Sequence, residues 1–346
     1  MFGSLLRFIA LATLVILPYR ASVALAQPQS DDFPLTITDD SGTTTTFAAP
    51  PRRVVSLNPG LTEITFALGH GDSLAAVDSY SDYPPEARNI QPRLTAFPNP
   101  SVEAIVALQP DLVLTLAESD DVVAQLRAQG IPVVKMFPKD YDATIETVRT
   151  LGRLYGSPDA GEALATDMSS RRDAVVAAVA DAPRPRVYEE LDASQPGMPF
   201  AAGPNGFYGQ LIDLAGGTNI FADLPGDVGR VGAESIVQRD PEVIILTDSD
   251  LPFNPQSPDM VRARPGWSVI SAVRNGAIYA VPGSLYSTPG PRLALGLEDL
   301  ARILHPDRFP ESRVASFESR VGSRESTMVG ERRTVFATRD FATRGP

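Results

Sequence analysis

The sequence predicts an α/β protein with two Rossmann-like lobes, each built on a parallel sheet and joined by one long helix. Three observations favour this fold. Short apolar strands alternate with helices along most of the chain, one helix-to-strand unit occurs twice, and a long helical stretch separates the two copies. Such alternation is typical of parallel sheets. We expect the ligand site in a cleft between the lobes, beyond the strand ends.

The first 26 residues are predicted to be a cleaved signal peptide. An apolar run over residues 8–18 follows Arg7, and Ala24-Leu25-Ala26 has the small residues of a cleavage site. The run is too short to span a bilayer. Because the chain has no cysteine to accept a lipid, the mature protein is expected to be periplasmic and not a lipoprotein.

The composition excludes several classes of function. A formal net charge of −12 argues against binding nucleic acid, which needs clustered Lys and Arg, and against an anionic membrane surface. The absence of cysteine excludes thiolate metal sites. His70 and His305, interpreted as surface loop residues, are too few for a zinc or manganese receptor. We therefore expect no cofactor, no metal held by protein side chains and no direct membrane insertion.

The N-terminal lobe is predicted over residues 27–140. It begins with a strand pair at 36–38 and 43–47 around an Asp-Asp-Ser-Gly turn. Short buried strands of the parallel sheet are expected at 54–57 and 131–136.

A helix is predicted directly after the strand at 54–57. Asn58 is suited to cap its N-terminus, and Pro59 is suited to the first helical position. Gly69 can end the helix. The polar cap would therefore lie at the end of a buried strand.

A helical connection is predicted over residues 141–182. Gly-Ser-Pro at 156–158 separates a first helix from a second one over 159–180. At 1.5 Å per residue the second helix is about 33 Å long, roughly the width of a lobe. The C-terminal lobe is then predicted over 183–310.

Residues 311–346 are predicted to form a disordered or loosely attached tail. This segment is rich in Ser, Thr, Arg and Gly, and it lacks the hydrophobic stripe that a partner-binding helix would need.

The repeated unit covers residues 103–115 and 234–247, with an offset of 131 positions between Glu103 and Glu234. Each copy has Glu, then Ile-Val, then Pro, an acid and an apolar strand at matching positions. Helix, proline and strand are common in α/β proteins, but the shared register of these residue types favours two lobes of similar construction.

Several motifs resemble periplasmic binding proteins of ABC importers for cobalamin, haem and ferric siderophores. The Ser-Tyr-Ser-Asp-Tyr-Pro-Pro run at 79–85 is especially similar to cobalamin-binding members. The other matching segments are 53–63, 68–69, 201–203, 214–219, 264–267 and 289–292, together with the two repeats. The resemblance covers about residues 50–305. It implies class III binding-protein architecture, a small-molecule metal chelate as ligand, and an ABC importer permease dimer with its ATPase as partner of a monomer.

The resemblance also implies roles for individual residues. Glu103 and Glu234, one in each lobe, match the glutamates that dock onto permease arginines in this family. Aromatic side chains would cover a large flat ligand, and arginines would pair with its carboxylate or phosphate groups. Phe97 and Phe200 are equally compatible with the core. The implied ligand residues are Ser56, Asn58, Pro59, Tyr80, Tyr83, Phe97, Phe200, Arg230, Tyr286 and Arg292.

The chain departs from the cobalamin-binding pattern at several positions. Phe97 and Leu116 stand where those members have cleft tryptophans, and the single tryptophan, Trp267, lies in a stretch that looks structural. The loop at 283–290 lacks the charged residues expected there. The ligand class therefore stays open between corrinoids, ferric siderophores and haem.

An enzyme and a scaffold are the alternatives from other classes. Hydrolases and glycosyltransferases also use two-lobed α/β folds, and Asp78, Asp82 and Glu189 are conceivable acid/base groups. However, the sequence has no dinucleotide-binding Gly-x-Gly-x-x-Gly after a strand, no Walker loop and no Gly-x-Ser-x-Gly elbow. No enzymatic activity is expected. A secreted scaffold or sensor would need no cleft ligand, and the tail is its main support.

Overall fold

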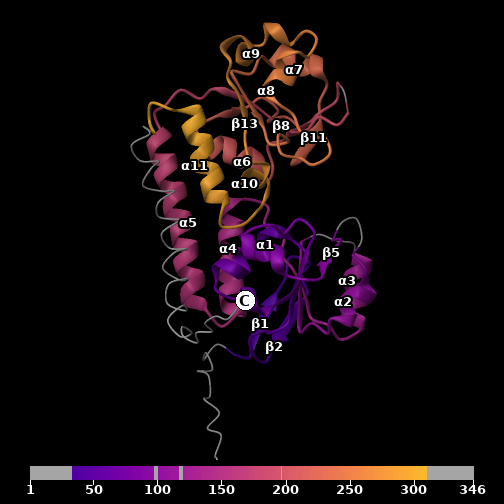
Figure 1. Ribbon diagram of the computed structural model, residues 1–346. Coiled ribbons are helices and arrows are strands. Elements are labelled where there is room, and N and C mark those ends of the chain that lie inside the picture. The colour runs from indigo at the N-terminus through magenta and orange to yellow at the C-terminus, as the bar shows by residue number, and fades with distance from the viewer. Residues whose placement is uncertain (1–32, 97–99, 117–119, 196, 310–346) are drawn as a thin grey trace, which may run out of the picture. The chain divides into compact units, whose positions relative to one another are not determined.

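The computed structural model describes residues 33–96, 100–116, 120–195 and 197–309 (Figure 1). The predicted signal peptide, Phe97 and the predicted tail lie outside these residues. Within the described part, two sheets are flanked by helices, which confirms the α/β fold class.

The first sheet has five strands in the order β5-β4-β3-β6-β7, and all neighbours are parallel. A separate antiparallel pair precedes it. The elements of this region are β1 (Leu35–Thr38), β2 (Thr44–Phe47), β3 (Val54–Ser56), α1 (Pro59–Ala67), η1 (Gly71–Ser73), β4 (Leu74–Asp78), η2 (Pro85–Asn89), β5 (Arg93–Leu94), α2 (Val102–Ala107), β6 (Leu112–Thr115), α3 (Asp120–Ala128) and β7 (Val133–Lys135).

The second sheet has the order β11-β9-β8-β12-β13, with β10 beside β8. The prediction of a parallel sheet holds for β8, β10, β12 and β13, but β9 and β11 run antiparallel at one edge. The elements are β8 (Arg186–Asp192), β9 (Phe200–Ala202), α6 (Phe207–Leu214), β10 (Thr218–Asn219), β11 (Val228–Arg230), α7 (Ala233–Arg239), β12 (Val243–Leu246), α8 (Pro258–Arg262), η3 (Trp267–Val269), α9 (Ser271–Asn275), β13 (Ile278–Ala280), α10 (Gly283–Ser287) and α11 (Leu293–Leu304).

Two helices connect the sheets: α4 (Tyr141–Leu154) and the long α5 (Pro158–Val179). They pack against each other at Gly152 and Gly161, where a Cβ on Gly152 would lie only 2.7 Å from the Gly161 Cα. The α11 helix packs on α5 (Figure 1), and Arg171 of α5 pairs with Glu298 of α11 at 2.7 Å. The connecting helix α5 is therefore held to α11, which follows the second sheet in the chain, by packing and by an ion pair.

The repeated unit has the same strand register in both sheets. Val54 of β3 pairs with Leu112 of β6, and Val187 of β8 pairs with Val243 of β12. In each sheet, the parallel strand that comes first in the chain, β3 or β8, therefore lies beside the strand of the repeat, β6 or β12. The sequence echo therefore corresponds to a structural repeat.

Local contacts before these strands are matched as well. The Arg53 amide donates to the Asp111 carboxylate at 2.8 Å, and the Arg186 amide donates to the Glu242 carboxylate at 2.9 Å. Gln109 (φ 48°) and Asp240 (φ 43°) are the two described non-glycine residues with positive φ. Both end the helix of a repeat, 131 positions apart, so the two copies also share an unusual backbone turn.

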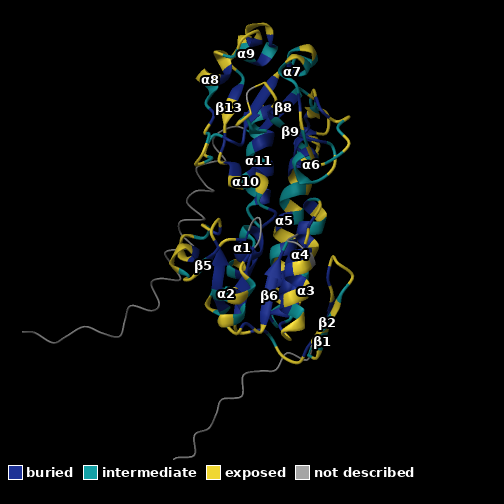
Figure 2. Ribbon diagram, turned by 90° about the vertical axis from the view of Figure 1, so that its right-hand side faces the viewer, coloured by how far each residue is buried: buried dark blue, intermediate teal, exposed yellow. Residues whose placement is uncertain are grey.

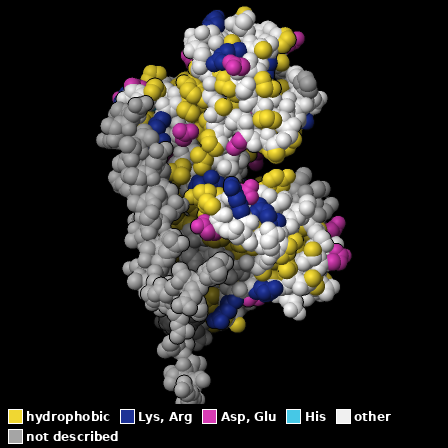
Figure 3. Space-filling view, in the orientation of Figure 1, with side chains coloured by type: hydrophobic (Ala, Val, Ile, Leu, Met, Phe, Trp, Pro, Cys, Tyr) yellow, Lys and Arg dark blue, Asp and Glu magenta, His cyan; other side chains and the backbone are white. Residues whose placement is uncertain are grey.

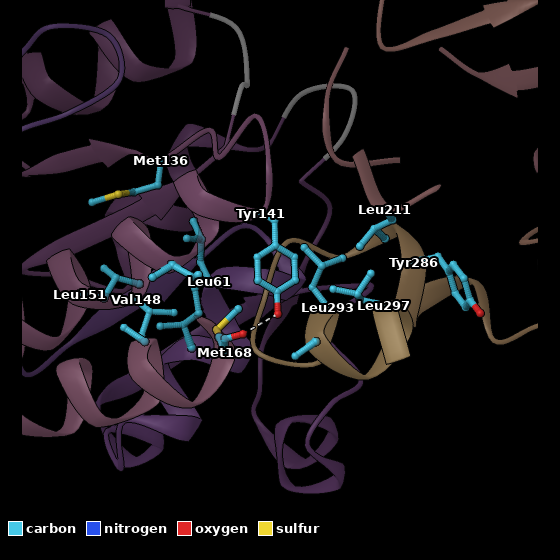
Figure 4. Close-up of a cluster of buried hydrophobic side chains, with 14 of the residues drawn as sticks. Leu61, Met136, Tyr141, Val148, Leu151, Met168, Leu211, Tyr286, Leu293 and Leu297 are labelled. Atoms are coloured by element: carbon cyan, nitrogen blue, oxygen red, sulfur yellow. Dashed lines mark hydrogen bonds between the residues drawn. The ribbon is translucent and has the colours of Figure 1, made fainter. Parts of the chain in front are cut away.

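One large apolar cluster connects the sheets and the linking helices. It includes Leu61 of α1, Val148 of α4, Met168 of α5 and Leu297 of α11, and Figure 4 shows these side chains together. The buried Tyr141 hydroxyl donates to the Met168 carbonyl at 3.0 Å. Figure 2 shows buried strands in both sheets and exposed outer faces on the surrounding helices.

Two single-residue interpretations have clear outcomes. Trp267 is buried and packs edge-on against Tyr188, so its structural role is confirmed. His305 is not a surface loop residue, because it is buried at the end of α11. Across the described ranges, no helix combines the length and apolar character needed to cross a membrane.

Candidate functional site

A pocket of about 570 Å³ lies where strands of both sheets end. Its lining residues follow the carboxyl ends of β3, β4, β12 and β13, which is where open α/β sheets bind ligands. Figure 3 shows acidic and basic side chains lying side by side around a hollow in the surface. The lining residues are Asn58, Pro59, Glu63, Tyr80, Asp82, Tyr83, Arg88, Thr247, Asp250, Leu251, Gly283, Ser284, Ser287, Thr288, Pro289 and Arg292.

Asn58 holds the start of α1 at this pocket. Its side-chain Oδ1 accepts hydrogen bonds from the amides of Gly60 at 2.8 Å and Leu61 at 3.2 Å. Pro59 occupies the first helical position, as predicted. Because Oδ1 serves as the helix cap, the Nδ2 group is the part of Asn58 available to a ligand.

Ser56 is fully buried and does not line the pocket. Its hydroxyl donates to the Asn58 carbonyl at 3.2 Å and accepts from the Thr62 hydroxyl at 2.9 Å. The Thr62 hydroxyl lies 2.9 Å from that of Ser81, which is hydrogen-bonded to Asp78. Burial raises the pKa of Asp78, while the hydrogen bond from Ser81 opposes the shift. Ser56 therefore belongs to a buried network beneath the pocket.

The loop after β4 presents two of the predicted tyrosines. The Tyr80 side chain is 67% exposed, and its amide donates to Asp78 at 2.7 Å. Arg93 holds the same loop by donating to the Ser79 carbonyl and to Asp82, both at 2.9 Å. A rigid loop thus carries an exposed aromatic ring at the pocket.

Arg292 is placed in the pocket, but it already has protein partners. Its Nε donates to Glu63 Oε1 at 2.5 Å, and its guanidinium lies 3.9 Å above the centre of the Tyr83 ring. Glu63 is only 3% exposed. Burial raises the pKa of the Glu63 carboxyl, and the Arg292 charge opposes that shift.

Tyr286 lies in the core and not in the pocket. Its side chain is fully buried, and its hydroxyl donates to Asp299 at 2.8 Å. Figure 4 shows it with Leu211, Leu293 and Leu297 among the buried side chains. The α10 helix turns its glycine and serines toward the pocket, so the tyrosine on its other face packs inward.

Phe200 and Arg230 contact each other away from this pocket. They are paired across β9 and β11, with the guanidinium 4.2 Å from the ring centre, and neither is among the lining residues. The structure therefore brings together five of the ten predicted ligand residues: Asn58, Pro59, Tyr80, Tyr83 and Arg292.

Sequence reasoning missed several pocket residues, and Glu63 is the most important. It lies four residues after Pro59, and this spacing places both on one face of α1. Once Pro59 was predicted to line the site, this spacing could have predicted Glu63 there as well. Thr247, Asp250 and Ser284 follow β12 and β13, but without a known strand order nothing in the sequence brings them beside α1.

Glu103 and Glu234 have equivalent local positions. Each is exposed in the first turn of its helix, α2 or α7. The Ser101 hydroxyl donates to Glu103 at 3.1 Å, whereas Glu234 follows the glycine cap Gly232. Both carboxylates are therefore accessible at helix N-termini, where negative charge is favoured.

The fold and site define a class of proteins: two-sheet α/β ligand receptors with the pocket at the strand ends. The periplasmic binding protein family model matches residues 54–285, and the chain belongs to this family. It is 30% identical to an ABC transporter substrate-binding lipoprotein of Bacillus subtilis, over 83% of this chain and 90% of the relative. It is 33% identical to a cobalamin-binding protein of Halobacterium salinarum, over 79% of this chain and 74% of the relative.

Solved structures give the same family. The vitamin B12-binding protein of Vibrio cholerae is 27% identical, with a TM-score of 0.65 over 75% of this chain and 99% of that one. A periplasmic haem-binding protein of Roseiflexus is 28% identical, with a TM-score of 0.66 over 74% and 99%. A protein of an Fe³⁺-hydroxamate transport system from Saccharomonospora viridis is 28% identical, with a TM-score of 0.63 over 78% and 99%.

The prediction of a periplasmic protein that is not a lipoprotein is wrong as stated. The Bacillus subtilis relative is a lipoprotein, so membership of this group does not separate anchored from free proteins. The family supports the broader statement of an extracytoplasmic location.

Proposed function

We propose that this protein is an extracytoplasmic substrate-binding protein that captures a bulky metal chelate and delivers it to an ABC importer. The pocket carries the proposal, because hydroxyl and aromatic side chains from loops of both sheets converge on it. A corrinoid or a ferric siderophore is the proposed ligand, in line with the cobalamin-binding and hydroxamate-transport relatives. Haem is the second candidate, favoured by the Roseiflexus structure.

Within this proposal Asn58, Tyr80 and Tyr83 contact the ligand directly. Tyr80 offers an exposed ring, which buries a large area at small entropic cost. Ser56 acts indirectly by holding the Asn58 carbonyl. Tyr286, Phe200 and Arg230 are not included, because none of them lines the pocket.

The proposed partner is a permease dimer with its ATPase, contacted through Glu103 and Glu234. Matched, exposed carboxylates in two copies of one repeat suit a two-fold symmetric partner, and such charges steer association and set register. We propose that the protein acts as a monomer. Its proposed divisions are 27–140, 141–182 and 183–310.

Ligand binding tests the proposal. Purified protein is mixed with cyanocobalamin, ferric siderophores and haemin, and its melting temperature is measured with increasing ligand. Specific binding stabilises the folded state by RT ln(1 + [L]/Kd), about 2.7 kcal/mol at a hundredfold excess over Kd. If no metal chelate raises the melting temperature, the proposed function is rejected.

We also propose that the protein has no enzymatic activity. The acids suggested by the sequence, Asp78 and Glu189, are both buried and do not line the pocket, so neither is placed to reach a substrate there. Asp82 does line it, but it is paired with Arg93. Turnover of a bound chelate, seen as a changed mass after release, would contradict this.

A further inference from the structure

The charges around the pocket bear on which chelate the protein selects, if the proposed function holds. The lining residues carry three carboxylates, on Glu63, Asp82 and Asp250, and two guanidiniums, on Arg88 and Arg292. The lining residues alone therefore carry a formal charge of −1, and the partners of each charge determine what a ligand meets.

The Arg292 charge is already balanced inside the protein. Glu63 is 229 positions away in the sequence, and its Oε1 accepts the Arg292 Nε hydrogen bond at 2.5 Å. One face of the guanidinium covers the Tyr83 ring at 3.9 Å. An incoming carboxylate would have to compete with Glu63 for the Arg292 guanidinium. Glu63 is only 3% exposed, so its carboxylate cannot turn away into solvent.

Glu63 itself retains unsatisfied hydrogen-bonding capacity. Its Oε2 is buried and has no hydrogen-bond partner within the described part of the chain. An unpartnered carboxylate oxygen favours nearby hydrogen-bond donors and disfavours nearby negative charge. Because this oxygen is buried, a ligand does not contact it directly, but it disfavours negative charge at this end of the pocket.

The remaining lining charges leave no surplus of positive charge in the pocket. Asp82 pairs with Arg93 at 2.9 Å, and Arg93 is not a lining residue. Asp250 accepts only a hydrogen bond from the Gly283 amide, at 3.2 Å. Arg88 is exposed and forms no ion pair with any described residue, so it offsets Asp250 at most. The other polar lining groups are neutral: Asn58, Tyr80, Tyr83, Thr247, Ser284, Ser287 and Thr288.

We infer that the pocket selects a chelate whose rim carries neutral amide or hydroxamate groups, or a positive charge, and disfavours chelates whose rim carries carboxylates or catecholate charge. Neutral hydroxyl and amide groups can satisfy such a rim without desolvating an unpaired charge. Discrimination against an anionic rim comes from repulsion by Asp250 and from the Arg292 guanidinium, which Glu63 already neutralises and which is therefore not free to bind an anion.

Competition binding on the unmodified protein tests the inference. The probes are cyanocobalamin, with a carboxamide rim, a cationic ferric trihydroxamate, haemin with two carboxylates, and a ferric tris-catecholate. We expect the tighter of the first two to bind at least tenfold more tightly than either anionic probe. Tighter binding of either anionic probe would overturn the inference and leave the proposed function intact. If none binds, the proposed function fails, and the inference fails with it.

Two variants locate the effect. Asp250→Asn keeps the hydrogen-bond acceptor at the rim and removes its charge, so affinity for haemin should rise severalfold while affinity for the preferred probe changes less than twofold. Glu63→Gln leaves Arg292 without its counter-ion and should raise haemin affinity about tenfold or more. Glu162→Gln, in a surface pair with Arg149 on α4 and α5, is the matched control and should change neither affinity. If Asp250→Asn leaves haemin affinity unchanged, charge does not determine selection, even where Glu63→Gln fails to fold.

Discussion

Glu63 of α1 and Arg292, the residue before α11, form an almost buried ion pair that connects the two halves of the chain at the pocket. The arginine also stacks on Tyr83, so three pocket residues from separate parts of the chain form one unit. Arg292 was predicted to bind the ligand, but it forms a structural contact within the protein. Its charge is therefore already neutralised before a ligand enters the pocket.

Removing the cation of this pair should destabilise the protein strongly. Arg292→Ala leaves Glu63 buried without a counter-ion, and breaking a buried pair in this way costs about 3–5 kcal/mol. Urea denaturation measures the change in the free energy of unfolding. Arg149→Ala, which breaks a surface pair, should cost no more than about 1 kcal/mol. Equal losses in the two variants would show that the Glu63 pair has no special role.

Gly60 permits a close approach of α1 to the loop before α11. A Cβ at this position would lie 2.5 Å from the Pro289 carbonyl oxygen, so Gly60→Ala must push backbone apart at the base of the pocket. We expect a loss of about 1–3 kcal/mol, measured by thermal unfolding, together with weaker ligand binding. Gly226→Ala is the control, because its Cβ would meet its nearest atom at 3.7 Å. A stable Gly60→Ala with unchanged ligand affinity would contradict the close approach.

The helix cap at Asn58 should contribute separately to stability. Asn58→Ala removes the acceptor for the Gly60 and Leu61 amides, at a cost of about 1 kcal/mol. Asn58→Ser retains a capping oxygen and should recover most of that loss while still removing the Nδ2 donor. Ligand titration of both variants then separates the two roles of Asn58, because only a direct contact would weaken binding in the serine variant.

Stability should fall as pH rises toward 8. Burial raises the pKa of Glu189 from 4.5 to about 8. For Asp248, burial and then the neighbouring Glu190 carboxylate raise the pKa from 3.8 to about 7. In that pH range the folded protein keeps protons that the unfolded chain has lost, so the free energy of unfolding decreases with increasing pH.

Glu189→Gln should reduce this pH dependence, because the amide stays neutral in both states. The difference in unfolding free energy between pH 5 and pH 8 should shrink by roughly 3 kcal/mol, as determined from urea denaturation at each pH. Glu162→Gln, at an exposed position, should leave the slope unchanged. An unaltered slope in Glu189→Gln would mean that the side chain is ionised in the folded protein.

Charge reversal tests the proposed permease contacts. Glu103→Lys combined with Glu234→Lys should abolish uptake by cells that carry the importer, because both docking charges would oppose those of the permease. Ligand affinity of the purified variant should stay within twofold of the original, since neither residue lines the pocket. Reversal of the exposed Glu146 and Glu162 is the control and should preserve uptake. Loss of ligand affinity in the double variant would refute the assigned role.

The sequence predicted the repeated lobes and the cap at Asn58, because helix caps and repeat registers are encoded within a few neighbouring residues. It failed where the outcome depended on which face of an element packs inward. Tyr286 and His305 looked like loop residues, yet both are buried, and the Tyr286 hydroxyl donates to Asp299 of the next helix, α11. The Glu63–Arg292 pair was similarly invisible, since nothing local connects positions that far apart. Of the expected ligand residues that the structure describes, Ser56, Phe200, Arg230 and Tyr286 do not line the pocket.

The apolar cluster that runs from α1 through α4 and α5 to α11 has a mechanical consequence. Swinging one sheet away from the other would wet these side chains, at about 25 cal/mol for each Å² exposed. Under the proposed function we therefore expect cargo to enter through movement of rings and loops at the mouth, with little difference in outline between the empty and filled receptors. With Glu103 and Glu234 as the proposed docking points, their spacing would stay constant, so a transporter that ignores empty carriers would have to sense rigidity or surface charge near the mouth.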